Sequence, residues 1–293
     1  MEKLEQKIVE ECKKYEGTPL CLSGGIDSSL LAVHIKPKFA ISVELPEGDK
    51  YNEIEWAKKV AKQLNIEHVI VKPDESKFEE YVKIAVKAIG RPIPHFNIFP
   101  LYCMYQKLAE MGVKEVILGD GPDEVMCGYA RDLIINYLYK VYEFEAFEHY
   151  KPLIDQILPP LYPILIRRLT NTHAFTILEA DVEMRKDMDD MSNGIAAHFG
   201  IKNIRPYQDN IVLDNFMRNL PIEEKIKDVE YGKYALRKIL EQYLPEIAWR
   251  KKKVGGPVYP VNLKMGWGWI ETYGEFGKKG WLEYQQNILD GDK

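Results

Sequence analysis

The chain has 293 residues, of which 46% are hydrophobic and 29% charged, a composition typical of a globular protein with a sizeable buried core. Its net charge of −5 argues against a surface that binds nucleic acid as a whole, and no apolar run is long enough to span a membrane. The four cysteines form no Cys-x-x-Cys pair, and the chain opens on a charged amphipathic segment rather than a signal peptide, so we expect a cytoplasmic protein without a zinc or iron–sulfur centre.

Hydrophobic periodicity predicts a first helix and then an alternation of strands and helices. The first helix is expected over residues 2–15. Strands are expected over residues 19–22, 39–43, 68–71 and 115–118, and helices over residues 27–34, 52–64, 76–89 and 100–111. Repeated strand–helix units predict a parallel sheet with right-handed crossovers and helices on both faces. Ligands of such sheets bind at the carboxyl ends of the strands.

The pattern changes in the second half of the chain. After about Tyr129 the strand signals stop, and residues 130–250 have the pattern of helices interrupted by prolines. We therefore predict an α/β domain over residues 1–140 and a mostly helical region over residues 141–293 that completes a cleft. The aromatic tail, which includes Trp281, is expected to pack against the protein body or a partner.

A glycine- and serine-rich segment follows the first predicted strand. Gly24 and Gly25 let the backbone N–H groups turn toward an anion, and the helix that follows adds the positive end of its dipole. Hydroxyl groups come from Ser23, Ser28 and Ser29. This pattern predicts a loop that binds nucleotide phosphate. Asp27 would repel phosphates unless Mg²⁺ lay between them, so we predict it as a metal ligand. The alternative is an ordinary turn in which Asp27 caps the helix.

A second loop, with two glycines and three carboxylates, follows the last predicted strand. It reads Gly119-Asp120-Gly121-Pro122-Asp123-Glu124. Because both loops follow strands of one parallel sheet, we expect them at the same edge, with Asp123 sharing the Mg²⁺ held by Asp27. The alternative is an acidic turn that caps the next helix.

The first loop resembles the Ser-Gly-Gly-x-Asp-Ser loop of the N-type ATP pyrophosphatases, which cleave ATP between the α and β phosphates. Over residues 17–255 the chain resembles the synthetase domain of the asparagine synthetases. The further matching motifs are the second loop with Cys127-Gly128-Tyr129, then Pro206-Tyr207-Gln208-Asp209, Leu220-Pro221, Lys233-Tyr234-Ala235-Leu236-Arg237, Leu244-Pro245 and Trp249-Arg250-Lys251-Lys252. The resemblance implies a twisted, parallel, Rossmann-like sheet of the adenine nucleotide α hydrolase type, followed by a helical region.

The resemblance also implies a two-step reaction with ATP and Mg²⁺. A substrate carboxylate attacks the α-phosphorus and releases pyrophosphate, and ammonia then displaces AMP to give an amide. The resemblance places the catalytic lysine at Lys252, one acid of an acid–base pair at Asp120, and the second at Asp187 or Asp189. The implied metal ligands are Asp27 and Asp123. The implied nucleotide-binding residues are Leu22, Ser23, Gly24, Gly25, Asp27, Ser28, Ser29, Val43, Gly119, Gly121 and Lys233.

The sequence departs from the family pattern on the substrate side. The ATP loop comes too early for an N-terminal glutaminase domain, so we expect free ammonia, a separate glutaminase subunit or another nucleophile. Residues 93–100 contain no arginine where the family has one suited to an α-carboxylate, and Arg91 has a different offset. The substrate is therefore predicted as a small carboxylate, aspartate or a related compound. A homodimer is also considered, and no nucleic acid or membrane partner is expected.

Two other interpretations stay open. One is a tRNA-thiolating enzyme of the wider superfamily with Cys127 as its thiol, although the acidic pI and the missing Cys-x-x-Cys argue against it. The other is a nucleotide sensor without turnover, because the substrate side departs from the family more than the nucleotide loops do.

Overall fold

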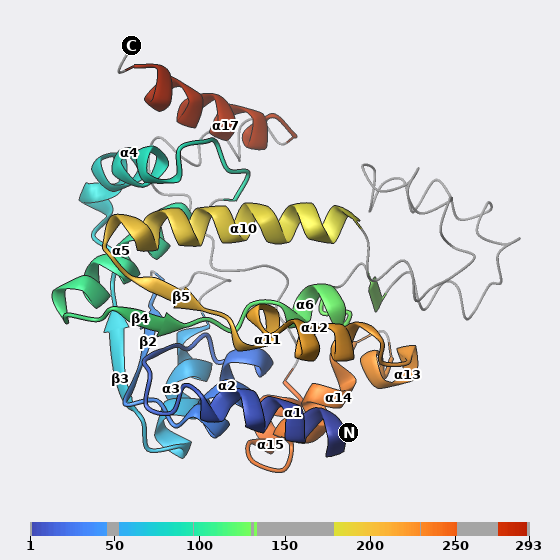
Figure 1. The fold of residues 1–293 in the computed structure, drawn as a ribbon. Helices are drawn as coiled ribbons and strands as arrows, with labels where there is room; N and C mark the ends of the chain where they lie inside the picture. The colour runs from blue at the N-terminus through green and yellow to red at the C-terminus, as the bar shows by residue number, and fades with distance from the viewer. Residues whose placement is uncertain are drawn as a thin grey trace, which may run out of the picture.

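The computed structural model describes residues 2–45, 53–95, 97–129, 132–133, 179–228, 230–250 and 275–291. Its centre is one parallel sheet with strand order β3-β2-β1-β4-β5 (Figure 1). The strands are β1 (Leu20–Cys21), β2 (Phe39–Val43), β3 (Glu67–Val71), β4 (Glu115–Ile117) and β5 (Lys202–Ile204). The expected α/β class and parallel sheet are therefore confirmed.

Helices cover both faces of the sheet (Figure 1). In the first half they are α1 (Glu2–Lys13), α2 (Ile26–Ile35), α3 (Ile54–Gln63), α4 (Phe78–Ile89), α5 (Ile98–Glu110) and α6 (Pro122–Val125), with a 3₁₀ turn over Glu75–Lys77 before α4. In the second half they are α10 (Glu179–His198), α11 (Pro206–Asp209), α12 (Ile211–Arg218), α13 (Ile222–Lys225), α14 (Tyr234–Leu240), α15 (Pro245–Ala248) and α17 (Glu275–Asp290).

The alternation of side chains along the strands builds two hydrophobic cores. Successive residues of a strand point to opposite faces of the sheet. In β2, Ala40 joins the core under α1, α2, α3, α14 and α15, while Phe39 and Ile41 join the core under α4, α5, α10 and α17. Ile117 and Val116 of β4 divide in the same way. Helices from both halves of the chain therefore share each core.

Most expected elements are confirmed with small shifts at their ends. The bounds of β2 are those predicted, and α5 begins two residues earlier than expected, at Ile98. The expectation that strands end near Tyr129 was wrong, because β5 pairs in parallel with β4 at the edge of the sheet. Its sequence, Lys202-Asn203-Ile204, is short and mostly polar, so it shows no apolar run. The domain boundary near residue 140 lies outside the described residues, and that division stays a prediction.

Side chains of the C-terminal helix α17 form hydrogen bonds with the backbone of the segment that joins α4 to α5. The Gln285 amide accepts a hydrogen bond from the Ile93 N–H at 2.9 Å and donates one to the Ile93 carbonyl at 2.8 Å. The Trp281 ring N–H donates to the His95 carbonyl at 3.0 Å. Both side chains are buried, which confirms that Trp281 of the tail packs against the protein body. None of the helices in the described ranges combines the length and hydropathy needed to cross a bilayer.

We expect Gln285→Leu to lower the free energy of unfolding by about 2 kcal/mol or more, because it leaves two buried backbone groups of Ile93 without their partner. Gln286→Leu on the exposed side of the same helix is the matched control and should change it by less than about 0.5 kcal/mol. Urea unfolding of the two variants measures the difference. Equal effects would show that the two Gln285 hydrogen bonds to Ile93 do not stabilise the protein.

Candidate functional site

The two loops predicted to bind nucleotide and metal lie in contact at one edge of the sheet. β1 and β4 are neighbouring parallel strands, with Leu20 opposite Ile117, so both chains leave the sheet at the same edge. The loops then pack so closely that a Cβ on Gly119 would lie 3.0 Å from the backbone nitrogen of Ser28. This close approach explains why the second loop begins with glycine.

Hydrogen bonds of the serine hydroxyls fix the conformation of the first loop. The Ser28 hydroxyl accepts the Ser23 N–H at 3.2 Å and lies 3.0 Å from the Ser23 hydroxyl, which accepts the Gly25 N–H at 3.1 Å. Gly24 has a φ of +69°, and a Cβ there would lie 2.4 Å from the Ala57 nitrogen at the start of α3. Only glycine fits this position. The loop thus leads directly into the N-terminus of α2, as a phosphate cradle requires.

One buried lysine joins the two predicted metal ligands. The Lys233 ammonium lies 2.5 Å from a carboxylate oxygen of Asp27 and 2.8 Å from one of Asp123. Burial alone would lower the pKa of Lys233, which is 4% exposed, but Asp123 and Asp27 together raise it above its ordinary value. Gly25, rather than Asp27, is the N-cap residue of α2, so the capping interpretation of Asp27 finds no support.

The backbone around this lysine is shaped by two glycines. Lys233 has a φ of +54°, and its N–H donates to the Met126 carbonyl at 2.9 Å. A Cβ on Gly128 would lie 2.0 Å from an Asp123 carboxylate oxygen and 2.4 Å from the Lys233 side chain. A Cβ on Gly232 would lie 1.9 Å from the Cys127 carbonyl oxygen. The Cys127-Gly128-Tyr129 motif therefore makes room for the carboxylate and the ammonium together.

A second charged cluster surrounds Arg205, which sequence reasoning missed. Its guanidinium lies 3.4 Å from Asp120 and 3.2 Å from Asp189, and it also donates to the Ser192 hydroxyl at 2.7 Å. The Gln208 amide donates to the other oxygen of Asp189. Arg205 stands directly before the motif that begins at Pro206, but its partners Asp120 and Asp189 lie outside that motif and are not indicated by the local sequence.

The two acids of this cluster have raised pKa values. Partial burial raises the pKa of Asp120, whose side chain is 43% exposed; Arg205 opposes this rise, and the charge of Asp189 adds to it. Burial likewise raises the pKa of Asp189 against the opposing effect of Arg205. Both carboxylates therefore hold a proton more readily than an acid with its ordinary pKa would, and they share one guanidinium.

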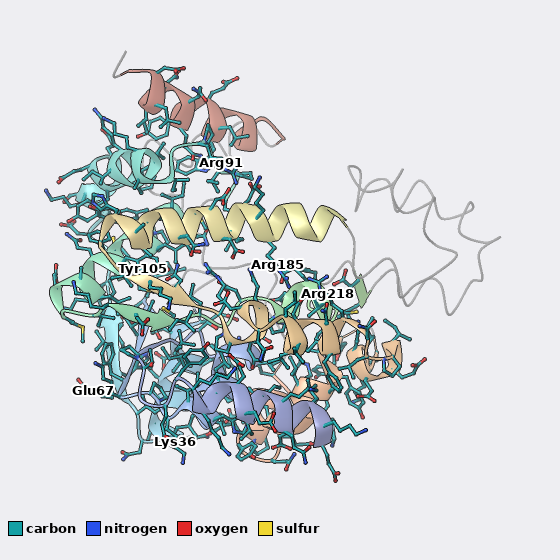
Figure 2. The ribbon with its side chains drawn as sticks, viewed as in Figure 1. Lys36, Glu67, Arg91, Tyr105, Arg185 and Arg218 are labelled. Atoms are coloured by element: carbon teal, nitrogen blue, oxygen red, sulfur yellow. The ribbon has the colours of Figure 1, made fainter. Side chains whose placement is uncertain are left out.

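Asp187 lies in a different environment. Arg91 binds Asp187 at 2.6 Å and Asp190 at 2.7 Å, so these acids form a separate ion-pair cluster. Figure 2 shows Arg91 on the α17 side of α10 and Arg185 on the side that faces α6 and α12. The two candidates for the second catalytic acid are therefore not equivalent: Asp189 joins Asp120, and Asp187 does not.

Two further side chains brace the loops. Arg185 donates to the Gly121 carbonyl at 3.1 Å and lies 3.3 Å from Asp214. The buried Tyr207 hydroxyl donates to the Asp27 carbonyl at 3.2 Å. Tyr207 belongs to a motif recognised in the sequence, whereas Arg185 had no sequence signal that singled it out. Both residues fix the backbone beside the predicted metal ligands.

The remaining predicted residues lie close by or outside the described chain. Leu22 and Val43 stand at the carboxyl ends of β1 and β2. Lys252 lies outside the described residues. The chain shortly before it is fixed by Arg237, which donates to the carbonyls of Ala248 at 2.6 Å and Arg250 at 3.3 Å.

The chemistry of Asp27, Asp123 and Cys127 indicates which ligands suit the site. Asp27 and Asp123 offer carboxylate oxygens, which Mg²⁺ prefers. In the part of the chain that the structure describes, no three His, Cys, Asp or Glu residues gather around one point. Cys127, the thiol of the tRNA-modifying alternative, is 0% exposed. Its burial is unfavourable for attack on a large nucleic-acid substrate.

The chain is similar in sequence to a known protein family and to several of its members. Residues 18–266 match the family described as asparagine synthase. The chain belongs to the asparagine synthase family. It is 26% identical over 279 residues to asparagine synthetase B (glutamine-hydrolysing) of Escherichia coli and 25% identical over 278 residues to the glutamine-hydrolysing asparagine synthetase of Asparagus officinalis. These alignments cover 87% and 85% of the chain but 42% and 39% of the relatives.

A homologue from Methanocaldococcus jannaschii gives a similar result. It carries the name of a glutamine-hydrolysing asparagine synthetase and is 26% identical over 282 residues, which are 90% of the chain and 51% of the relative. The chain therefore spans about half the length, or less, of the curated relatives it matches. Residues 18–266, which match the family, contain both loops at the sheet edge.

The close approach of Gly24 to α3 yields a stability prediction. We expect Gly24→Ala to lower the free energy of unfolding by about 3 kcal/mol or more, because the new methyl group meets backbone atoms of Trp56 and Ala57. Gly112→Ala is the matched control: its φ of +73° is similar, but its Cβ would enter open space. That variant should cost about 1 kcal/mol from backbone strain alone. Equal losses in urea unfolding would contradict the predicted clash.

Proposed function

We propose that the protein is an ATP-dependent, AMP-forming ligase that adenylates a small carboxylate and then transfers ammonia to it. The observation that supports this most is the meeting of Asp27 and Asp123, from two loops at one sheet edge, around a single cation position. Membership of the asparagine synthase family supports the same reaction class.

The residues present fit a magnesium ion between the loops. Two carboxylates converge on one cationic group, and Gly128 leaves the space that this convergence requires. Asp27 and Asp123 would hold the ion, whose chemistry is to neutralise and polarise phosphate oxygens as charge builds up on pyrophosphate. The Ser23–Ser29 loop and the N-terminus of α2 would bind the phosphates of ATP through N–H and hydroxyl groups. Leu22, Val43, Gly119 and Gly121 would complete the nucleotide site.

The proposed reaction has two balanced steps. In the first, a carboxylate oxygen of the substrate bonds to the α-phosphorus, and the bond from that phosphorus to the bridging oxygen breaks, which releases pyrophosphate. In the second, ammonia bonds to the acyl carbon, AMP leaves with the acyl C–O electron pair, and the surplus proton passes to an acid–base group. We propose Asp189 and Asp120 for this proton, because both acids flank Arg205 and have raised pKa values.

Lys252 is proposed to stabilise the charge that develops at the α-phosphate. Its place two residues after Arg250, whose Nη2 donates to both carboxylate oxygens of Glu53 at 3.1 Å, supports this role. Arg237 and Glu53 thus fix the chain at Arg250.

The acyl substrate and the nitrogen source are proposed at the level of chemical class. Arg91 already binds two carboxylates, which disfavours a role in binding the α-carboxylate of aspartate. A small carboxylate is therefore the proposed substrate, with aspartate as one candidate. Because the relatives are named as glutamine-hydrolysing, a glutaminase subunit is the proposed ammonia source, alongside free ammonia. A homodimer and a cytoplasmic location stay predictions, as does the non-catalytic sensor.

We expect Asp27→Asn and Asp123→Asn each to slow pyrophosphate formation by at least about 100-fold, because each removes a charged ligand of the proposed ion. The assay measures pyrophosphate release with MgATP, ammonia and a panel of small carboxylates that includes L-aspartate. Asp74→Asn is the control: Asp74 caps a surface turn, and asparagine caps equally well. Wild-type rates in the two site variants, or ATP binding without turnover on any carboxylate, would contradict the proposal.

The two acids of α10 provide a matched pair for the second step. We expect Asp189→Asn to slow amide formation by about 100-fold or more while pyrophosphate–ATP exchange is retained, because it removes one acid of the pair at Arg205. Asp187→Asn should cause a much smaller loss, since Asp190 still binds Arg91. Single-turnover rates of the two steps separate the effects. A larger loss in Asp187→Asn would reverse the assignment.

A further inference from the structure

Lys233 occupies the cation position between the two proposed metal ligands. Its ammonium contacts Asp27 and Asp123 at ion-pair distance, and these acids come from different loops. The lysine itself comes from a third segment, directly before α14. One side chain from the second half of the chain therefore forms ion pairs with both strand-end loops of the first half.

The backbone at Lys233 is fixed, while its side chain has the means to move. Its N–H donates to the Met126 carbonyl, and its own carbonyl accepts the Arg237 N–H at 3.0 Å. Its left-handed conformation is one that a non-glycine residue rarely adopts without support from its surroundings. Beyond this fixed point the four-carbon stem of a lysine is flexible, so its ammonium can change partners without a change of the backbone.

We propose that the Lys233 ammonium and Mg²⁺ compete for the same pair of carboxylates, so that the metal binds tightly only together with nucleotide. The inference rests on the proposed function, because it takes Asp27 and Asp123 as the metal ligands. It adds an order of binding to that function. Lys233 weakens the binding of Mg²⁺ alone, and its ammonium leaves the carboxylates when the phosphates of the nucleotide bind.

Charge balance explains the expected order. Two carboxylates and one ammonium have a net charge of −1, and a divalent cation that enters beside the ammonium is repelled by it at short range. When the phosphates of ATP enter with the metal, they add negative charge and offer the ammonium new oxygen partners. The lysine then gains a partner as it loses the carboxylates, so the metal–nucleotide complex is favoured over the ion alone.

Direct metal binding tests this competition without any turnover. Lys233→Met and Lys233→Gln remove the charge, and glutamine keeps a donor for the carboxylates in case methionine prevents folding. We expect either variant to bind Mn²⁺, the probe ion, at least about tenfold more tightly than the wild type in the absence of nucleotide. Titration calorimetry, or the electron paramagnetic resonance signal of free Mn²⁺, measures this affinity. Affinity equal to that of the wild type would overturn the inference.

Two controls show where the gain in affinity arises. Lys225→Met removes another buried lysine, whose ammonium donates to the Arg218 carbonyl at 2.7 Å, and it should leave Mn²⁺ affinity unchanged. Lys233→Gln combined with Asp27→Asn should lose the gain. A gain that survives in the double variant would place the ion elsewhere and overturn the competition.

Thermal unfolding provides a second readout. Without nucleotide, Mg²⁺ should raise the melting temperature of Lys233→Gln and have little effect on that of the wild type, because ligands stabilise the state that binds them. An equal effect on both proteins would contradict the competition. If Asp27→Asn abolishes pyrophosphate formation while Lys233→Gln gains no metal affinity, the proposed function stands and only this inference fails.

Discussion

The meeting of two carboxylates at one cation is the interaction on which the site depends. The carboxylates of Asp27 and Asp123 both contact the Lys233 ammonium, at 2.5 and 2.8 Å. Without a positive charge between them, these two carboxylates would repel each other. The sheet brings them together because β1 and β4 are neighbours that end at the same edge. The ammonium of Lys233 then links these two loops to the second half of the chain. A local charge requirement thus joins three segments that lie far apart in the sequence.

The periodicity of α10 separates two kinds of acid on one helix. Asp187 and Asp190 are three residues apart, lie on the same face, and share Arg91. Asp189 is displaced around the helix and meets Arg205 together with Asp120. A run of acids that looks uniform in sequence therefore contains an ion-pair cluster on one side and a pair with raised pKa values on the other. This geometry makes Asp189 the better candidate for proton transfer.

The sequence predicted those parts of the fold and site that depend on local patterns. Strand ends followed by glycines located both loops, and the strand–helix alternation identified the parallel sheet. It did not predict β5, because an edge strand of three mostly polar residues has no hydrophobic pattern of its own. It also missed Arg205 and Arg185, since their roles depend on partners far away in the chain, such as Asp120, which lies 85 residues before Arg205.

Partners far away in the chain also explain why the sequence alone could not choose between Asp187 and Asp189 as the second catalytic acid. For the same reason it could not assign a role to Arg91. Near a substrate segment, an arginine with the wrong offset could still reach a carboxylate by a change of rotamer. What decides its role is whether nearby acids already neutralise it, and Asp187 and Asp190 lie 2.6 and 2.7 Å from it. A substrate carboxylate would therefore have to displace at least one of these acids from Arg91. The ion pairs of Arg91 with Asp187 and Asp190, more than its position in the sequence, therefore argue against Arg91 as the residue that binds the substrate carboxylate.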